Sequence, residues 1–458
     1  MNDDFAFCSI TSLTQKLANN EISPLQLVEL FAGRINRFNN KSRAFISLDL
    51  DAALANATKI TYQPQKPLCA IPYACKDLFD VKGKITSAGS AVLQDNVATA
   101  DAAVISRMNA AGGIYLGKNN LHEFAYGATG ENSLYGTPPN PYDSSRLAGG
   151  SSSGSVTAVG YGLCAAALGT DTGGSVRAPA ALCGLVGFKP TYGRISTEGV
   201  IPYSWTLDHV GTITRSAEDA SILFEILADS FQPTGSNAAV QLDGLRVGIP
   251  ETFFYQKADA EILDCLDRLM TLLKDSGAKL TRVPMPSMEF TRTVSLTVQM
   301  PEALSYHNRY LESRGDLYSQ EFRAGLALGQ CLLAEQYVRA KRFIETYRRD
   351  TDAVFKDVDL LLTPATPAIA PKIGSVEVTT DGYTEPAGNA ITRYTSFFNM
   401  TGHPAITFPC GMHSEGLPIA AQLIGRHYED ENLIDLTSLI ERELNLNLGN
   451  PVGREKDT

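Results

Sequence analysis

Residues 148–177 read AGGSSSGSVTAVGYGLCAAALGTDTGGSVR, and the interpretation of the whole sequence starts from this stretch. It contains two glycine-serine clusters, GGSSSGS and GTDTGGS, joined by a segment too apolar to be a flexible linker. Neither cluster carries the lysine of a phosphate-binding loop, and no G-x-G-x-x-G fingerprint of a dinucleotide site is present. The run from Gly173 to Arg177 also does not match the G-x-S-x-G nucleophile elbow. The two clusters therefore indicate a different chemistry.

Consecutive glycines allow neighbouring backbone N–H groups to converge on one point, which favours binding of a negative charge. Ser175 ends the GTDTGGS run, so its hydroxyl would lie beside such an oxyanion hole. A serine hydroxyl needs a base, and without a nearby histidine the candidates are a lysine or a carboxylate. Lys76 stands in the apolar context IPYACK, where burial would lower its pKa. For one cluster alone, a tight turn with a capping serine remains an alternative explanation.

Three further segments extend the pattern. They are IPYACKDLFDVKG (71–83), GRISTEGVIPYSWTLDHVGTITRS (193–216) and SFFNMTGHPAITFPCG (396–411). Together with the two clusters, they resemble the amidase signature family of serine hydrolases. The resemblance covers most of the chain from about residue 65 to residue 440. The spacing of the two serine clusters is specific to that family.

The resemblance implies a role for each matching residue. Ser175 is similar to the acylated nucleophile, Ser151 to a bridging serine held by a cis peptide bond, and Lys76 to the general base. The remaining matches are the oxyanion-hole N–H groups of Thr172, Gly173 and Gly174, and the supporting residues Ser152, Asp171 and Arg177. His209 stands beside Asp208, and with a complete Ser–Ser–Lys set we interpret it as a structural histidine.

The alternation of expected helices and strands predicts a single α/β domain over residues 1–458 with a central, at least partly parallel sheet. The resemblance implies the amidase signature fold, in which a central mixed sheet is covered on both faces by helices. Residues 1–60 are expected to form a helical segment, residues 65–445 the amidase core, and residues 449–458 a flexible tail. A βαβ unit is expected over residues 243–286 and a long helix or helix pair over residues 320–357.

The formal net charge of −11 argues against binding to nucleic-acid phosphates or to anionic membranes. The acidic N-terminus does not resemble a signal peptide, and no apolar run is long enough to span a bilayer. We therefore expect a cytoplasmic protein. The eight cysteines form no C-x-x-C pair and the six histidines are dispersed, so we expect neither a metal site nor a cofactor.

The function expected first is hydrolysis of a carboxamide C–N bond, which gives a carboxylic acid and ammonia or an amine. An alternative is the glutaminase (A) subunit of a tRNA-dependent amidotransferase, although residues 326–349 lack the tyrosine-rich helix of that protein. The third alternative is a degenerate, non-enzymatic binding protein. The sequence Arg146-Leu147-Ala148 before the Gly-Gly pair resembles ureide-type members of the family that act on substrates such as 1-carboxybiuret or allophanate.

The loop over residues 124–150 is expected to line the substrate pocket. Tyr126, Thr129 and Tyr135 are its first candidates for contact with a small-molecule amide. Family resemblance also makes a homodimer plausible, and an accessory subunit stays open.

Overall fold

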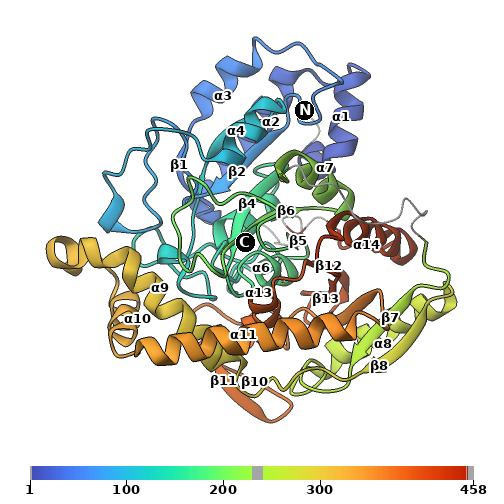
Figure 1. Cartoon of the computed structure of the whole chain (residues 1–458). Coiled ribbons are helices and arrows are strands. Elements are labelled where there is room, and N and C mark those ends of the chain that lie inside the picture. Colours follow the sequence, from blue (N-terminus) through green and yellow to red (C-terminus); the bar gives the residue numbers. More distant parts are fainter. Residues whose placement is uncertain (1–2, 230–240, 450, 452–458) are drawn as a thin grey trace.

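A mixed sheet of eleven strands runs through the computed structural model, which describes residues 3–229, 241–449 and 451 (Figure 1). From one edge to the other, the strands are β1 (Phe45–Leu48), β3 (Ile114–Asn119), β2 (Pro72–Lys76), β4 (Ala166–Asp171), β6 (His209–Thr214), β5 (Val186–Lys189), β12 (Ala405–Met412), β13 (Pro418–Ile424), β9 (Leu360–Pro364), β7 (Arg246–Pro250) and β8 (Lys279–Val283). Strand β2 is parallel to β3 and β4, and β7 is parallel to β8 and β9. The other ladders are antiparallel, which confirms the predicted mixed α/β fold.

Helices cover both faces of this sheet. Gly187 of β5 faces α6 (Arg177–Leu182), and a Cβ at this glycine would lie 2.7 Å from the Ala180 Cβ. The next residue, Phe188, packs its ring edge-on against Phe224 of α7 (Ala217–Leu227), at 5.3 Å between ring centroids. Because successive strand residues point to opposite faces, α6 and α7 lie on opposite sides of β5.

The remaining elements surround this sheet. The helices are α1 (Ile10–Ala18), α2 (Pro24–Ser42), α3 (Leu50–Ala57), α4 (Ala103–Ala110), α5 (Ser153–Gly160), α8 (Ala260–Asp275), α9 (Thr291–Arg314), α10 (Gln320–Gln330), α11 (Ala334–Val354), α12 (Ala387–Thr392), α13 (Phe397–Thr401) and α14 (Asp430–Leu444). Short 3₁₀ turns lie at Asp3–Phe7, Ala91–Leu93, Glu123–Ala125 and Gly315–Leu317, and β10 (Glu377–Thr380) pairs with β11 (Tyr383–Pro386) in a separate hairpin.

The stretch over residues 148–177 folds as helix α5, strand β4 and then helix α6. A Cβ at Gly154 in α5 would lie 2.4 Å from the backbone nitrogen of Asn120, so only glycine permits this close approach. Strand β4 then runs parallel to β2, with Leu168 opposite Cys75. The carboxyl ends of β2 and β4 therefore meet at the same edge of the sheet. This pairing brings Lys76 to the start of the GTDTGGS turn.

Several local predictions are confirmed. The βαβ unit is β7–α8–β8 with parallel strands, and the charged segment 320–357 is the helix pair α10 and α11. The N-terminal segment 1–60 differs from the prediction because it also contains strand β1, which pairs antiparallel with β3 at the sheet edge. Most of the predicted tail over residues 449–458 lies outside the described residues.

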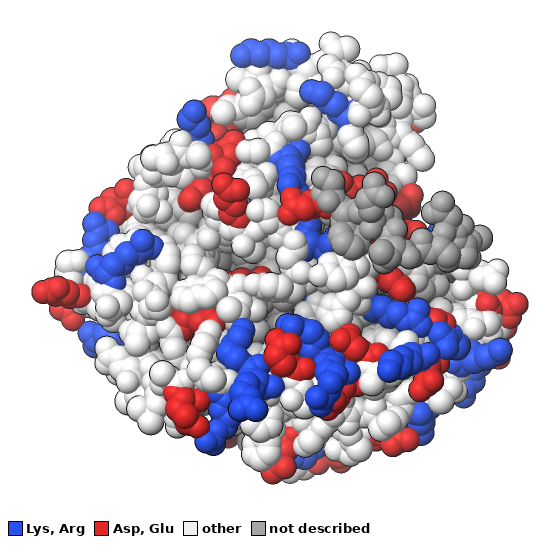
Figure 2. All heavy atoms as spheres, in the orientation of Figure 1, with Lys and Arg blue, Asp and Glu red and all other residues white. Residues whose placement is uncertain are grey.

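The surface of the molecule carries both signs of charge. On the face drawn in Figure 2, the basic side chains over α11 are interspersed with acidic ones. Among the described residues, no helix has both the length and the apolar character needed to cross a bilayer.

Candidate active site

Lys76 is the last residue of β2 and its side chain is completely buried. The Lys76 Nζ lies 2.7 Å from the Ser151 Oγ and 2.9 Å from the Thr170 Oγ1. Burial lowers the pKa of Lys76 to about 7, and the carboxylates of Asp208 and Asp171 oppose this shift. A substantial fraction of neutral amine is therefore present near neutral pH, as a lysine base requires.

Ser151 follows a cis peptide bond from Gly150, as the family resemblance implied. The chain is tightly packed at this point, because a Cβ at Gly150 would lie 2.5 Å from the Gly130 backbone nitrogen. The Ser151 carbonyl accepts a hydrogen bond from the His122 N–H at 3.1 Å. The backbone around Ser151 is thus fixed on both sides of the hydroxyl that faces Lys76.

Ser175 lies in the turn between β4 and α6 and is 7% exposed. The Ser152 N–H donates to the Ser175 carbonyl at 3.3 Å, and the Ser152 hydroxyl donates to the Thr170 carbonyl at 3.4 Å. Ser152 therefore ties the two serine clusters together. Among the described residues, no hydrogen bond joins the hydroxyls of Ser151 and Ser175, so a direct proton transfer requires these two groups to approach one another.

One of the three N–H groups predicted to form the oxyanion hole has a hydrogen-bond partner within the protein. The Gly174 N–H donates to the Asp171 Oδ1 at 2.8 Å, so this group is already occupied. Its orientation follows from the backbone: Gly174 has φ of +126°, and a Cβ there would lie 1.9 Å from the Thr395 Oγ1. The N–H groups of Thr172 and Gly173 are the predicted donors that remain.

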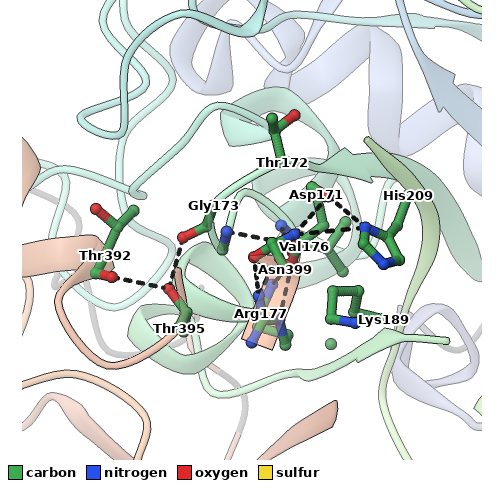
Figure 3. A network of polar contacts seen from close by, with 12 residues as sticks. Asp171, Thr172, Gly173, Val176, Arg177, Lys189, His209, Thr392, Thr395 and Asn399 are labelled. Atoms are coloured by element: carbon green, nitrogen blue, oxygen red, sulfur yellow. Dashed lines mark hydrogen bonds and ion pairs between the residues drawn. The ribbon is translucent and has the colours of Figure 1, made fainter. Parts of the chain in front are cut away.

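Asp171 and Arg177 form a completely buried ion pair behind this turn (Figure 3). The Arg177 Nη2 lies 2.9 Å from the Asp171 Oδ1, and its Nε lies 3.0 Å from the Oδ2. The Asn399 amide also donates to the carboxylate at 2.9 Å. Burial by itself raises the pKa of Asp171, but Arg177, Asn399 and the nearby Lys189 hold that pKa well below its usual value. The ionised pair keeps the turn that bears Ser175 in one conformation.

The neighbouring histidine has the structural environment that we expected. The His209 Nδ1 lies 2.7 Å from the Leu207 carbonyl, and burial lowers the pKa of this imidazole. Asp208 instead accepts a 2.5 Å hydrogen bond from the Thr172 hydroxyl. His209 therefore helps to position β6 and is not hydrogen-bonded to Ser151 or Ser175.

A cavity of about 580 Å³ opens in front of Ser175. Thr172 and Gly173 form part of its wall, and so do two of the predicted pocket residues, Tyr126 and Thr129. The third, Tyr135, does not line this cavity, because the loop turns away there and the Tyr135 N–H donates to the Asn132 side chain at 2.9 Å.

The opposite wall was missed by the sequence analysis. It includes Arg292, Ser295, Gln299, Glu321, Asn389 and Ser396. These residues come from α9, α10, α12 and the segment before α13. Arg292 and Gln299 are seven positions apart, as on one helix face, but nothing in the local sequence indicates that this face lines a pocket.

Comparisons with known proteins agree with this geometry. The profile of a protein family described as Amidase matches residues 26–434. The A-type subunit of a glutamyl-tRNA(Gln) amidotransferase from Coxiella burnetii is 34% identical over 475 aligned positions, which cover 95% of this chain and 97% of that protein. A crystal structure described as an amidase is 34% identical, with a TM-score of 0.89 over 95% of this chain and 99% of the other. A chain from a structure described as a vestigial protein complex that reveals the evolutionary origins of an s-triazine catabolic enzyme is 30% identical, with a TM-score of 0.89 over 96% of this chain and 99% of the other.

Proposed function

Since this chain belongs to the amidase signature family of Ser–Ser–Lys hydrolases, we propose that it hydrolyses the C–N bond of a small polar carboxamide through an acyl-enzyme on Ser175. The observation that carries this proposal is the 2.7 Å contact between the buried Lys76 Nζ and the Ser151 Oγ. It lies directly behind the turn that presents Ser175 to the cavity.

In the proposed reaction, neutral Lys76 accepts the proton of the Ser151 hydroxyl. Ser151 in turn accepts the proton of Ser175 as the Ser175 Oγ attacks the amide carbon. The carbonyl oxygen gains the negative charge, which the N–H groups of Thr172 and Gly173 stabilise. Ser151 returns a proton to the nitrogen, the C–N bond breaks, and ammonia or an amine leaves, while the Lys76 ammonium returns its proton to Ser151 and becomes neutral again. Water then attacks the ester of Ser175 by the same proton path and releases the carboxylic acid.

The far wall supports the small, polar character of the substrate. Side chains of Arg292, Gln299 and Asn389 offer hydrogen-bond donors to a ligand in the cavity. A ureide such as 1-carboxybiuret has many carbonyl and amide groups for such donors, and the similarity to a chain of the complex linked to the origins of an s-triazine catabolic enzyme favours this subclass. An extended aryl or lipid amide would leave these polar groups without partners.

A second candidate function is favoured by the amidotransferase relatives. In that case the chain would release ammonia from glutamine and would work as the glutaminase component of a larger complex. The absence of a tyrosine-rich sequence in α10 and α11 argues against it.

We propose that the enzyme acts as a homodimer or with an accessory subunit. Light scattering of the purified protein tests this point directly.

The deciding experiment measures ammonia release from a matched panel: glutamine, short aliphatic amides, an aryl amide, and the ureides biuret and 1-carboxybiuret. The Ser175→Ala variant purified in parallel supplies the background. Turnover of a small amide or ureide by the protein alone supports the first function. Glutamine hydrolysis that appears only with co-expressed partner subunits would favour the second. No turnover of any of these amides under either condition would contradict both.

A further inference from the structure

Three side chains from separate segments converge away from the Ser175 cavity. Asp352 lies near the end of α11, His403 follows α13, and His427 lies between β13 and α14. One ligand atom from each residue lies within 4.8 Å of the others. The Asp352 Oδ1 is 3.1 Å from the His403 Nε2 and 3.0 Å from the His427 Nδ1. The sequence offered no metal motif because the three residues are far apart along the chain.

The contacts of His427 indicate which of its ring nitrogens carries the proton and which presents a lone pair to Asp352. Its Nε2 lies 3.0 Å from the Thr401 carbonyl, which can only accept, so the Nε2 carries the proton. In the neutral ring, the Nδ1 is therefore the nitrogen that carries the lone pair. A lone pair and a carboxylate oxygen then face each other at 3.0 Å. A cation between them would turn this repulsion into attraction.

His403 supplies an independent observation. Its side chain is fully buried, and although the Nε2 lies 3.1 Å from the Asp352 Oδ1, neither ring nitrogen forms a hydrogen bond among the described residues. A buried polar group without a partner is costly unless a ligand satisfies it.

We propose that Asp352, His403 and His427 bind one divalent transition-metal ion, with Zn²⁺ the best match to their chemistry. Two imidazole nitrogens and one carboxylate oxygen are a common zinc ligand set. Zinc bonds of about 2.0–2.2 Å at tetrahedral angles place the ligand atoms roughly 3.3–3.5 Å apart. The observed distances of 3.0 and 3.1 Å from the carboxylate oxygen to the imidazole nitrogens require only a small expansion.

The surroundings indicate a structural metal with access from solvent. The Asp352 side chain is 50% exposed and that of His427 is 21% exposed, so ions can enter and water can complete the coordination. The ion would fasten the end of α11 to the segments that carry the two histidines. The His403 carbonyl also accepts a 2.6 Å hydrogen bond from the Lys189 Nζ, and Lys189 lies beside the Asp171–Arg177 pair in Figure 3. The bound metal would thus stabilise the segments around His403 and Lys189, which lie behind the active-site turn, without contacting Ser175.

Calorimetric titration of chelator-treated, full-length protein with ZnCl₂ tests the proposal. The wild type should bind one Zn²⁺ per chain, and its melting temperature should rise with the zinc concentration. His403→Ala and His427→Gln should each weaken Zn²⁺ binding by more than about 10-fold. Even the loss of a residue that only hydrogen-bonds to a metal ligand lowers metal affinity by about 10-fold or more. His427→Gln keeps the test valid if the His403→Ala variant does not fold, because the His427 side chain is partly exposed and its replacement should be tolerated.

His413→Gln is the matched control. His413 also faces two carboxylates, with its Nε2 3.6 Å from the Asp259 Oδ1 and 3.4 Å from the Glu261 Oε1, but its Nδ1 already accepts the Glu415 N–H. This variant should bind Zn²⁺ like the wild type. Cobalt substitution should give visible absorption bands of a four-coordinate ion in the wild type, and His427→Gln should lose them. No saturable binding, wild-type affinity in His427→Gln, or loss of binding in His413→Gln would overturn the proposal.

Discussion

The two walls of the Ser175 cavity are built in different ways. The inner wall comes from the loop with Tyr126 and Thr129 and from the turn over residues 172–175, and this turn is backed by Lys76 and by the buried Asp171–Arg177 pair. The outer wall comes from helices far apart in the chain and carries polar side chains such as the exposed Arg292. The inner wall thus has the groups and the rigidity that bond cleavage requires, whereas the outer wall has the variety that substrate choice requires.

The comparison predicts that changes in the inner wall abolish turnover of every amide alike. Ser175→Ala removes the proposed nucleophile and should lower kcat by about 10⁴–10⁶-fold for all substrates, because the covalent path is lost. Ammonia release by the purified variant measures this effect. An unchanged melting temperature would show that the fold is intact, and residual turnover within about 10-fold of the wild type would exclude Ser175 as the nucleophile.

Lys76→Met should lower kcat by at least about 10³-fold, because Ser151 loses the base that accepts its proton. In the wild type, only the neutral lysine is competent, so kcat/KM should rise with pH and level off above the Lys76 pKa of about 7. Below that pH, activity should fall by about 10-fold per pH unit. A pH–rate profile of the wild-type enzyme checks this sign.

Lys76→Arg separates the role of a base from that of a positive charge. Arginine keeps the charge but does not deprotonate in this pH range, so it should be nearly as inactive as Lys76→Met. Substantial activity in Lys76→Arg would show that the charge, and not proton transfer, is what the site needs.

Asp171→Asn should lower kcat by about 10²-fold and destabilise the protein by about 3–5 kcal/mol, since Arg177 would remain buried without its counter-ion. The pKa of Asp171 is lowered in the folded protein. Its contribution to stability is therefore present above the unfolded-state pKa of about 3.9 and is lost as pH falls through the folded-state value. Chemical denaturation of both proteins at neutral and acidic pH measures this difference.

Asp430→Asn is the control for burial of a carboxylate. Asp430 is also fully buried, but it accepts hydrogen bonds from the backbone N–H and the hydroxyl of Thr191 at 2.6 and 2.7 Å, away from the Ser175 turn. This variant should lose stability with little change in kcat. Equal losses of kcat in both variants would mean that Asp171 contributes only to general stability.

The same contrast explains which parts of the molecule the sequence reveals. Lys76 and Ser151 could be paired in advance only through the resemblance to the amidase signature family, and the structure places their polar atoms 2.7 Å apart. The occupied Gly174 N–H could not be foreseen, because it depends on the orientation that Arg177 and Asn399 impose on the Asp171 carboxylate.

The helix pair α10–α11 and the βαβ unit were predicted because their hydrophobic patterns are local. Strand β1 was missed because its four residues, FISL, are a short edge strand within a helical region, and only pairing with β3 defines it. Arg292 was missed for a related reason: its place in the cavity wall results from the packing of α9 against distant segments.

The smallest effect is expected for the outer wall, where Arg292→Gln should change selectivity and not the chemical step. Among the described residues, Arg292 forms no ion pair, and the acid Glu385, which lines a neighbouring pocket with Arg292, is paired with Arg393. The Arg292 guanidinium is thus available to an anionic group on the substrate. A hydrogen bond to a charged group contributes about 1.5–3 kcal/mol, so KM for an amide that carries a carboxylate should rise by roughly 10–100-fold.

A neutral amide of the same length should show less than about a twofold change in KM, with kcat nearly constant for both substrates. Arg309→Gln is the matched control, because this arginine lies on the same helix but stacks on Tyr306, with 4.3 Å from its guanidinium carbon to the ring centroid. It should leave both KM values unchanged. If Arg292→Gln instead lowered kcat equally for the anionic and the neutral amide, the two walls would not divide chemistry from selectivity, and α9 would have to be counted with the catalytic side.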